Sequence, residues 1–165
     1  MALQPAITDI EQLKEHPALS LLLNWRQDAV QQVKFDRDEM TIWVDRGSLR
    51  DACAVLRDDT KTQYNFLSDI TCVDWYPSEP RFEVVYSLLS LPRKDRVRLK
   101  VKLNGDDANL SSLTSLWPSA DFFEREVFDL FGVRFQGHPN LRRIMMPEDW
   151  EGHPLRKDYP VEGYR

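Results

Sequence analysis

Residues 124–159 read E-R-E-V-F-D-L-F-G-V-R-F-Q-G-H-P-N-L-R-R-I-M-M-P-E-D-W-E-G-H-P-L-R-K-D-Y, and a change of pattern within them decides the fold. The first residues continue an amphipathic pattern in which apolar side chains recur every three to four positions, as on one face of a helix: Ala120, Phe123, Val127 and Phe131. Gly132 stands where a left-handed cap ends such a helix. The sequence therefore predicts a helix that ends at Gly132.

The residues after Gly132 form a segment that is irregular without being disordered. Glycine and proline recur too often for a long helix or strand, at positions 137, 139, 147, 152, 154, 160 and 163. The segment also carries too much apolar surface to stay in water, in Phe135, Leu141, Ile144, Met145, Met146, Trp150, Leu155 and Tyr159. We call residues 133–165 the C-terminal arm. It must lie either on its own domain or on a partner protein.

Length, charge and hydropathy are those of a soluble protein with one buried core. The chain has 165 residues, of which 42% are hydrophobic and 30% charged. A formal net charge of -5 argues against general nucleic-acid binding, which needs a basic surface. No apolar run approaches the roughly 20 residues of a membrane helix. The acidic first fifteen residues lack the pattern of a secretion signal.

The two cysteines, Cys53 and Cys72, match no metal-ligand spacing and cannot build a disulfide framework. Cys53 falls on the apolar face of a predicted helix and Cys72 falls in a predicted strand, so we interpret both as core thiols. Reduced thiols of this kind indicate a reducing compartment, hence the cytoplasm.

Helices are predicted where an apolar stripe follows a start signal. The start signals are Thr8 with Glu11 as a capping box, Pro17 in a first turn, Ser48 as a cap, and Pro118 or Ser119 before the helix that ends at Gly132. Residues 111–117 are also expected to begin helical structure. The third helix has the clearest stripe of the first half, made of Leu49, Ala52, Cys53 and Leu56.

Five strands are predicted, at residues 29–35, 40–44, 66–76, 82–89 and 97–103. The strand at 82–89 is apolar on both faces, which is typical of a central strand covered twice. In the strand at 97–103, apolar residues alternate with Arg98, Lys100 and Lys102, so one face is basic and wet. The fold class is therefore α/β (α+β): a mixed sheet of about five strands with helices packed on it. We expect a core domain at 1–132 and an extended, partner-docking arm at 133–165.

Glu124, Glu126 and Asp129 form an acidic cluster, but the sequence offers no second group across a cleft that would make it catalytic. The alternative is that these acids pair with arginines such as Arg134, Arg142 or Arg143 and fasten the arm to the helix. Arginine suits this role because its planar guanidinium can hold a carboxylate or several carbonyl groups.

Other candidate sites are weaker. His138 and His153 each precede a proline and lack the close-spaced partner of a zinc site, so we interpret them as turn residues bound to backbone. Met145 and Met146 are expected to fill apolar space. The common phosphate-binding and hydrolase motifs are absent. The basic strand face could touch nucleic acid, although a solvated face or an acidic neighbour agrees better with the net charge.

From Glu124 to Pro160 the sequence closely resembles the signature of the C subunit (30 kDa-type) of proton-pumping NADH:quinone oxidoreductase, respiratory complex I. The preceding residues F-E-V-V-Y-S-L-L-S and S-L-T-S-L-W-P-S-A-D-F-F are similar in layout, while the first thirty residues match only weakly. The resemblance implies a structural subunit of the peripheral arm of the complex, without catalytic residues, metal or cofactor of its own. Iron–sulfur clusters, FMN and quinone would be held by partner subunits.

The resemblance also implies partners and a location. The chief partner would be the D subunit, which forms much of the quinone pocket, with the B and I subunits nearby. No nucleic acid and no homo-oligomer are expected. Membrane association would be indirect, on the cytoplasmic side of the bacterial inner membrane. Cousins of the family occur in ferredoxin-dependent complexes and membrane-bound hydrogenases, so the electron donor stays open.

The residues expected to dock partners are those of the signature with polar or large side chains. They are Glu124, Arg125, Glu126, Asp129, His138, Pro139, Arg142, Arg143, Trp150, Leu155, Arg156, Lys157, Asp158 and Tyr159.

Overall fold

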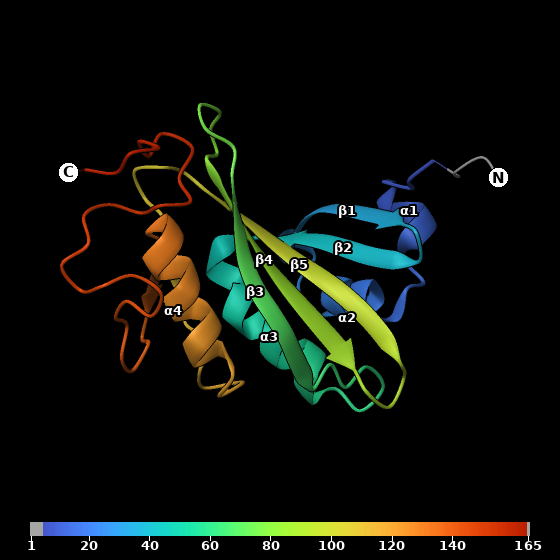
Figure 1. The fold of residues 1–165 in the computed structure, drawn as a ribbon. Helices are drawn as coiled ribbons and strands as arrows, with labels where there is room; N and C mark the ends of the chain where they lie inside the picture. Colours follow the sequence, from blue (N-terminus) through green and yellow to red (C-terminus); the bar gives the residue numbers. More distant parts are fainter. Residues whose placement is uncertain (1–4, 165) are drawn as a thin grey trace. The chain divides into compact units, whose positions relative to one another are not determined.

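The computed structural model describes residues 5–164. Residues 1–4, at the start of the predicted core domain, and residue 165, at the end of the predicted arm, lie outside the described residues. The helices are α1 (Ile10–Leu13), α2 (Pro17–Trp25), α3 (Leu49–Asp58) and α4 (Ala120–Phe131), with short 3-10 turns at Gln27–Ala29 and Arg46–Ser48. The strands are β1 (Val30–Asp36), β2 (Glu39–Val44), β3 (Phe66–Asp74), β4 (Phe82–Ser90), β5 (Asp95–Leu103), β6 (Asn109–Ser111) and β7 (Arg134–Gln136) (Figure 1).

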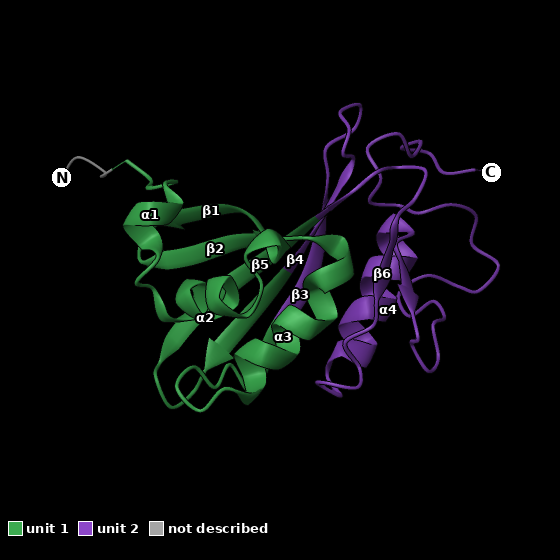
Figure 2. Cartoon of the chain, turned by 180° about the vertical axis from the view of Figure 1, so that it is seen from behind, with its two compact units in different colours: residues 1–68, 86–101 green, residues 69–85, 102–165 purple. Residues whose placement is uncertain are grey.

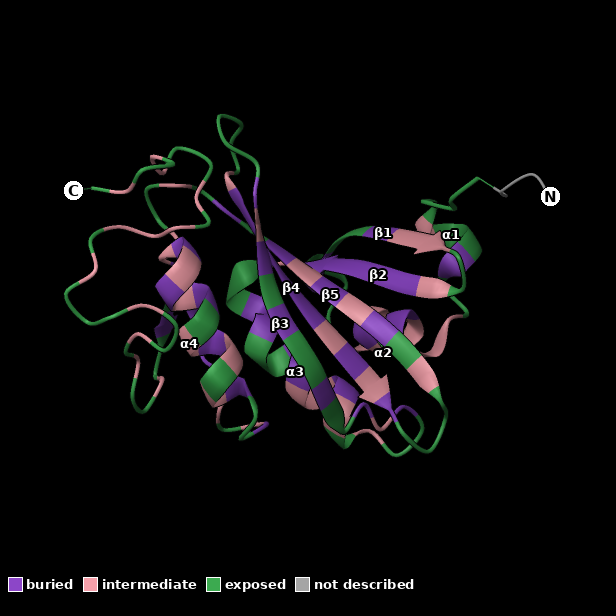
Figure 3. Ribbon diagram, in the orientation of Figure 1, coloured by how far each residue is buried: buried purple, intermediate pink, exposed green. Residues whose placement is uncertain are grey.

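Five strands form one mixed sheet in the order β1-β2-β5-β4-β3, which confirms the predicted fold class. β1 and β2 are an antiparallel hairpin, and β2 runs parallel to β5. The hairpin turn consists of Arg37 and Asp38, both at positive φ, as a tight turn matched to the strand twist requires. Along β5 buried residues alternate with more exposed ones, and β4 is apolar and mostly buried on both faces, as predicted (Figure 3).

The described chain divides into two compact units (Figure 2). Residues 1–68 and 86–101 form unit 1, and residues 69–85 and 102–165 form unit 2, so β3, β4 and β5 contribute to both. The C-terminal arm belongs to the same unit as α4. The division into a core at 1–132 and an arm at 133–165 stays a prediction.

The core of unit 1 lies between its helices and one face of the sheet. α2 and α3 contact each other and lie on the same face of the sheet (Figures 1 and 2). Their apolar stripes are fully buried, with Leu19, Leu22, Leu49 and Leu56 at 0% exposure.

Cys53 and Cys72 are buried free thiols, which confirms their interpretation as core residues. Burial raises the pKa of Cys53, and burial together with Asp74 raises the pKa of Cys72 to about 12.

One predicted helix cap is displaced by one residue, and a second lies at the predicted position but makes no capping hydrogen bond through its side chain. Asp9, and not Thr8, begins α1, because its carboxylate accepts a hydrogen bond from the Glu11 amide at 2.9 Å. Ser48 is the N-cap residue of α3, as predicted, but its side chain makes no capping hydrogen bond to the helix. Its amide and hydroxyl instead donate to the carboxylate of Asp45, which begins the preceding 3-10 turn.

Residues 111–117 were expected to be helical, and this expectation is wrong. Ser111 is the last residue of β6, which pairs in parallel with β7. These two strands form a second sheet that the sequence did not predict. The Ser112 amide donates to the Gln136 carbonyl at 2.8 Å, which keeps the chain extended. Only one turn forms afterwards, with the amides of Leu116 and Trp117 bound to the Leu113 carbonyl. In addition β3 ends at Asp74, two residues before the predicted end.

Helix α4 ends as predicted. Gly132 adopts φ +78° in the left-handed region, and its amide donates to the Phe128 carbonyl at 2.8 Å. A Cβ atom at this position would overlap the Arg156 guanidinium and would lie 2.6 Å from two ring atoms of His153. Glycine is therefore needed both for the turn and for the close approach of the arm.

Gly132→Ala should lower the free energy of unfolding by about 3 kcal/mol, because a left-handed alanine costs about 1 kcal/mol and the arm side chains must also move. Gly137→Ala is the matched control: Gly137 has φ +80° but nothing lies within 4 Å of an added Cβ. It should cost only about 1 kcal/mol. Urea unfolding of the two variants measures the difference, and equal losses would contradict the close approach.

Candidate functional site

The C-terminal arm follows α4 from its beginning to its end (Figure 1). Three helix residues spaced four apart meet it in order. At Asp121, the His138 ring nitrogen Nε2 lies 3.2 Å from the backbone carbonyl. At Arg125, the guanidinium donates to the carbonyls of residues 142 and 143 at 3.2 and 3.1 Å. At Asp129, the carboxylate binds residues 143–146. One stripe of α4 therefore holds residues 138–146 of the arm, which form no helix or strand.

Asp129 makes the densest of these contacts, which we call the Asp129 anchor. Its Oδ1 accepts from Nη1 of Arg143 at 2.6 Å. Its Oδ2 accepts from three successive backbone amides, those of Ile144, Met145 and Met146, at 3.0, 2.8 and 2.9 Å. Successive amides that converge in this way form a concave binding site for an anion. The anchor therefore defines the path of the arm over residues 143–146.

The Asp129 carboxylate is ionised although it has no exposed surface. Burial opposes ionisation, but the hydrogen bonds from Met146, Arg143, Ile144 and Met145 outweigh it and hold the pKa of Asp129 below its usual value. The predicted pairing of an α4 acid with an arm arginine is confirmed here for Arg143. The side chains of Arg134 and Arg142, the other two candidates, are exposed.

Glu124 has a different role from the predicted pairing with arginine. Its carboxyl is fully buried and binds the segment before α4: Oε1 accepts from the Leu113 amide at 2.6 Å and Oε2 from the Ser112 hydroxyl at 2.7 Å. Burial raises the pKa of Glu124 to about 7, against these two hydrogen bonds and with help from the negative charge of Asp121. Glu126 is not part of the stripe formed by Asp121, Arg125 and Asp129, and its side chain is exposed.

The arm also caps the C-terminal end of α4, where a helix leaves its last carbonyl groups without intrahelical partners. The Asp129 carbonyl accepts from His153 Nδ1 at 2.9 Å and from Arg143 Nη1 at 3.2 Å. The Leu130 carbonyl accepts from the Leu155 amide at 3.0 Å. The Phe131 carbonyl accepts from Arg156 Nε at 2.6 Å. Two arginines at a helix C-terminus also complement its partial negative charge.

A second ionic cluster fastens the end of the arm to the residues that join β3 and β4. Arg81 lies between two carboxylates: it donates to both oxygens of Asp74 at 2.9 Å and to those of Asp158 at 3.1 and 2.6 Å. The Lys157 amide donates to Asp74 at 2.8 Å, and the Arg156 guanidinium lies over the Phe82 ring. The bonds with Asp74 and Asp158 raise the pKa of Arg81.

The remaining predicted docking residues are at or near the surface. Pro139, Arg142, Leu155 and Lys157 are exposed, as is Glu126, whereas Trp150 and Tyr159 are half-buried. Arg143 also donates to the carbonyls of Trp150 and Gly152 at 2.8 and 2.9 Å. The predicted set therefore separates into residues that bind other parts of unit 2 and residues whose side chains are exposed.

The histidine interpretation is confirmed. His138 and His153 both bind backbone carbonyls of α4, and the His138 side chain is fully buried.

In the described residues no group of three His, Cys, Asp or Glu side chains could hold a metal ion. Across residues 5–164, every helix is too short or too polar to cross a bilayer. On the basic face of β5, Arg98 pairs with Glu39 and Lys100 lies over the Trp43 ring.

Sequence reasoning missed three residues of this site: Asp121, Asp74 and Arg81. Asp121 could have been found, because it lies four residues before Arg125 and eight before Asp129 on one face of α4. Asp74 and Arg81 had no such signal. Arg81 binds Asp158, which lies 77 residues away in sequence, and Asp74 joins this cluster through Arg81.

Residues 42–165 match the family described as "Respiratory-chain NADH dehydrogenase, 30 Kd subunit". The chain is 51% identical over 127 residues to the C subunit of NADH-quinone oxidoreductase from Citrifermentans bemidjiense, covering 77% of this chain and 78% of the relative. It is 46% identical over 152 residues to the corresponding C subunit of Geobacter sulfurreducens, covering 92% and 87%. The match thus extends well beyond the arm.

Two solved structures share the fold. The trypsin-resistant fragment of Nqo5 is 32% identical with a TM-score of 0.61, and the match covers 75% of this chain and 99% of that one. A chain of the membrane-bound sulfane sulfur reductase, an archaeal respiratory membrane complex, has a TM-score of 0.73 at 24% identity, over 90% and 86% of the two chains. The second likeness is one of fold alone.

Arg143→Ala should destabilise the isolated chain by about 3–5 kcal/mol, because it leaves the Asp129 carboxylate buried without its cation. Arg142→Ala, one residue away and exposed, should cost less than about 0.5 kcal/mol. Urea unfolding measures both, and limited proteolysis should cut the arm of the Arg143 variant faster. Equal stability of the two variants would contradict the Asp129 anchor.

Glu124→Gln should change how stability depends on pH. The folded pKa of about 7 lies above the ordinary 4.5, so the contribution of Glu124 is complete below pH 4.5 and is lost as pH rises through 7. The stability of the wild type relative to the glutamine variant should therefore fall between about pH 4.5 and 8, by up to about 3 kcal/mol. Denaturant titrations across this range measure it. A difference that is constant with pH would show that Glu124 does not titrate in this way.

Proposed function

The chain belongs to the 30 kDa subunit family of respiratory-chain NADH dehydrogenase, and from this premise we propose that it is a structural subunit of proton-translocating NADH:quinone oxidoreductase. In this role it supports electron transfer from NADH to quinone without taking part in the chemistry. Its relatives from Citrifermentans bemidjiense and Geobacter sulfurreducens are C subunits of NADH-quinone oxidoreductase, which favours NADH as the electron donor over the donors of more distant cousins.

The bonding of the acidic residues supports a non-catalytic role. Glu124 and Asp129 are the buried carboxyls of the signature, and both are held by donors of this chain. A general acid or base must instead reach a substrate. We accordingly propose that the iron–sulfur clusters, FMN and quinone of the complex are held by other subunits.

The observation that carries the docking proposal is the apolar surface that unit 2 leaves in solvent. Exposed large apolar side chains of a monomer, when gathered together, mark surfaces for partners. Those of unit 2 are Trp75, Tyr76, Phe122, Ile144, Met145, Leu155, Val161 and Tyr164. Five of the eight lie on the C-terminal arm, whose backbone is held by α4. Because the arm is fastened internally, these side chains are presented in defined positions.

We propose that the arm docks chiefly the D subunit, which forms much of the quinone pocket, with the B and I subunits nearby. The exposed members of the predicted set that form no ion pair within the described residues, Glu126, Pro139, Arg142, Leu155 and Lys157, would make direct contacts. The members that bind other parts of unit 2 would act indirectly, by holding the arm in place. Attachment to the membrane would be through the complex, on the cytoplasmic side of the bacterial inner membrane.

The proposal is tested with cells that express this chain as their only copy of the subunit. A blue-native gel of their membranes, probed for the chain and stained for NADH dehydrogenase activity, should show both signals in one large band. Loss of the chain should remove the assembled band, and the purified chain alone should oxidise no NADH. Turnover by the purified chain, or migration of the chain apart from the active band, would overturn the proposal.

Met145→Glu tests the docking surface itself. The side chain is 64% exposed, so the isolated chain should unfold at the same denaturant concentration as the wild type. Loss of an apolar contact worth about 2 kcal/mol should weaken docking roughly thirtyfold and reduce the assembled complex on the gel. Leu91→Glu, 58% exposed in unit 1, is the matched control and should assemble normally. If the two variants assemble equally well, docking does not use this part of the arm.

A further inference from the structure

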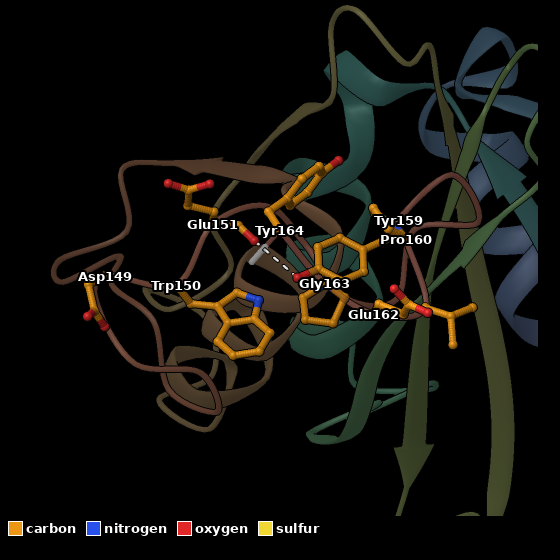
Figure 4. A pocket seen from close by; sticks show the side chains of 10 residues that line it. Asp149, Trp150, Glu151, Tyr159, Pro160, Glu162, Gly163 and Tyr164 are labelled. Atoms are coloured by element: carbon orange, nitrogen blue, oxygen red, sulfur yellow. Dashed lines mark hydrogen bonds between the residues drawn. The ribbon is translucent and has the colours of Figure 1, made fainter.

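The end of the C-terminal arm lines an open cavity of about 590 Å³ (Figure 4). Its walls include three aromatic side chains, Trp150, Tyr159 and Tyr164, and three acidic residues, Asp149, Glu151 and Glu162. All lining residues belong to unit 2 and lie between positions 149 and 164. The cavity is therefore a property of this segment alone.

The walls are held in place by specific contacts. Gly152 has φ +76°, and a Cβ there would lie 2.8 Å from Tyr159 and 2.9 Å from Tyr164, so both rings pack directly on its backbone. The two rings meet edge to face, with centroids 5.3 Å apart. The Tyr159 hydroxyl donates to the Glu151 carbonyl at 3.3 Å. Arg143 donates to the carbonyls of Trp150 and Gly152, so the Asp129 anchor also supports the cavity.

The charge of the cavity is one-sided. Asp149, Glu151 and Glu162 are exposed residues of its lining, and none of the described residues that line it is basic. Aromatic faces attract cations, and carboxylates around them add to the attraction. This combination suits the planar guanidinium of arginine, or the ammonium of lysine on its long apolar stem.

The surroundings of the cavity indicate the source of this cation. Val161 and Tyr164, which also line it, are exposed large apolar residues of the proposed docking surface. An opening that continues an interface is accessible to a side chain from the protein bound there. A volume of this size also exceeds what a single small ion would fill.

We propose that this cavity takes an arginine or lysine side chain of a neighbouring subunit, with the cation against the rings of Trp150, Tyr159 and Tyr164. The inference rests on the proposed function and deepens it, because it assigns a binding chemistry to one part of the docking surface. The Gly152 backbone and the Arg143 guanidinium preorganise the cavity for this side chain.

The first test measures how firmly the assembled complex keeps this subunit. Membranes that carry Glu151→Lys/Glu162→Lys in this chain are washed with increasing NaCl, and released chain is quantified. We expect release at least about tenfold greater than from the wild type at equal salt. Tyr164→Leu, which keeps the charges and removes one ring, should raise release about threefold. Asp106→Lys, an exposed acidic loop residue of the same unit, is the control and should behave as the wild type.

The second test identifies the occupant. A photo-crosslinking phenylalanine analogue replaces Val161, whose side chain is fully exposed beside the cavity. After irradiation of the assembled complex, mass spectrometry should find it joined to a peptide of another subunit that contains arginine or lysine. Changing that residue to glutamate should restore retention of the Glu151→Lys/Glu162→Lys variant. A crosslinked peptide without a basic residue, or no crosslink to another subunit, would overturn the inference.

The outcomes separate this inference from the proposed function. If the wild-type chain enters the complex but the double variant is released like Asp106→Lys, the cavity does not hold a basic side chain, while the structural role stands. If the wild-type chain never enters the complex, the proposed function fails, and the cavity inference fails with it.

Discussion

The buried carboxylate of Asp129 joins helix α4 to the irregular part of the C-terminal arm. It lies near the C-terminal end of α4 and binds one guanidinium and three consecutive amides of the arm. Burying a charge is costly unless it is paired and fully hydrogen-bonded, and here every bond comes from the arm. The helix and the arm therefore stabilise each other through this carboxylate.

Capping extends this dependence over the length of the arm. Carbonyl groups of the last turn of α4 are bound by His153, Leu155 and Arg156. Gly132 makes the approach possible because it has no side chain. The segment G-H-P-L-R near the end of the chain thus acts as a helix cap supplied from a distant part of the sequence, and the segment R-R-I-M-M as a binding site for a carboxylate. These roles give a physical reason for residue types that otherwise look unconnected.

The sequence predicted the parts of the structure that follow from local patterns. α4 and its glycine cap, the strands β1 and β2, and the alternation along β5 all depend on residues close together in the chain. It also indicated that an acid of α4 would meet an arm arginine. It could not choose between Arg134, Arg142 and Arg143, because that choice depends on how an irregular segment turns in space. The pairing of β6 with β7 and the meeting of Arg81 with Asp158 were missed for the same reason: each joins residues distant in sequence, and no periodicity marks such contacts.

The fastening of the arm to α4 has a consequence for the energetics of assembly. Ordering a flexible segment costs about 1–2 kcal/mol of backbone entropy per residue, and a partner that had to order the whole arm would lose much of its binding energy in doing so. In this chain the cost is met during folding, by the Asp129 carboxylate and the carbonyl groups of α4. A partner that docks as proposed would therefore meet a surface that is already ordered, and its affinity would reflect the contacts it gains. Such a subunit would associate by rigid docking, with no coupled folding step to slow its incorporation.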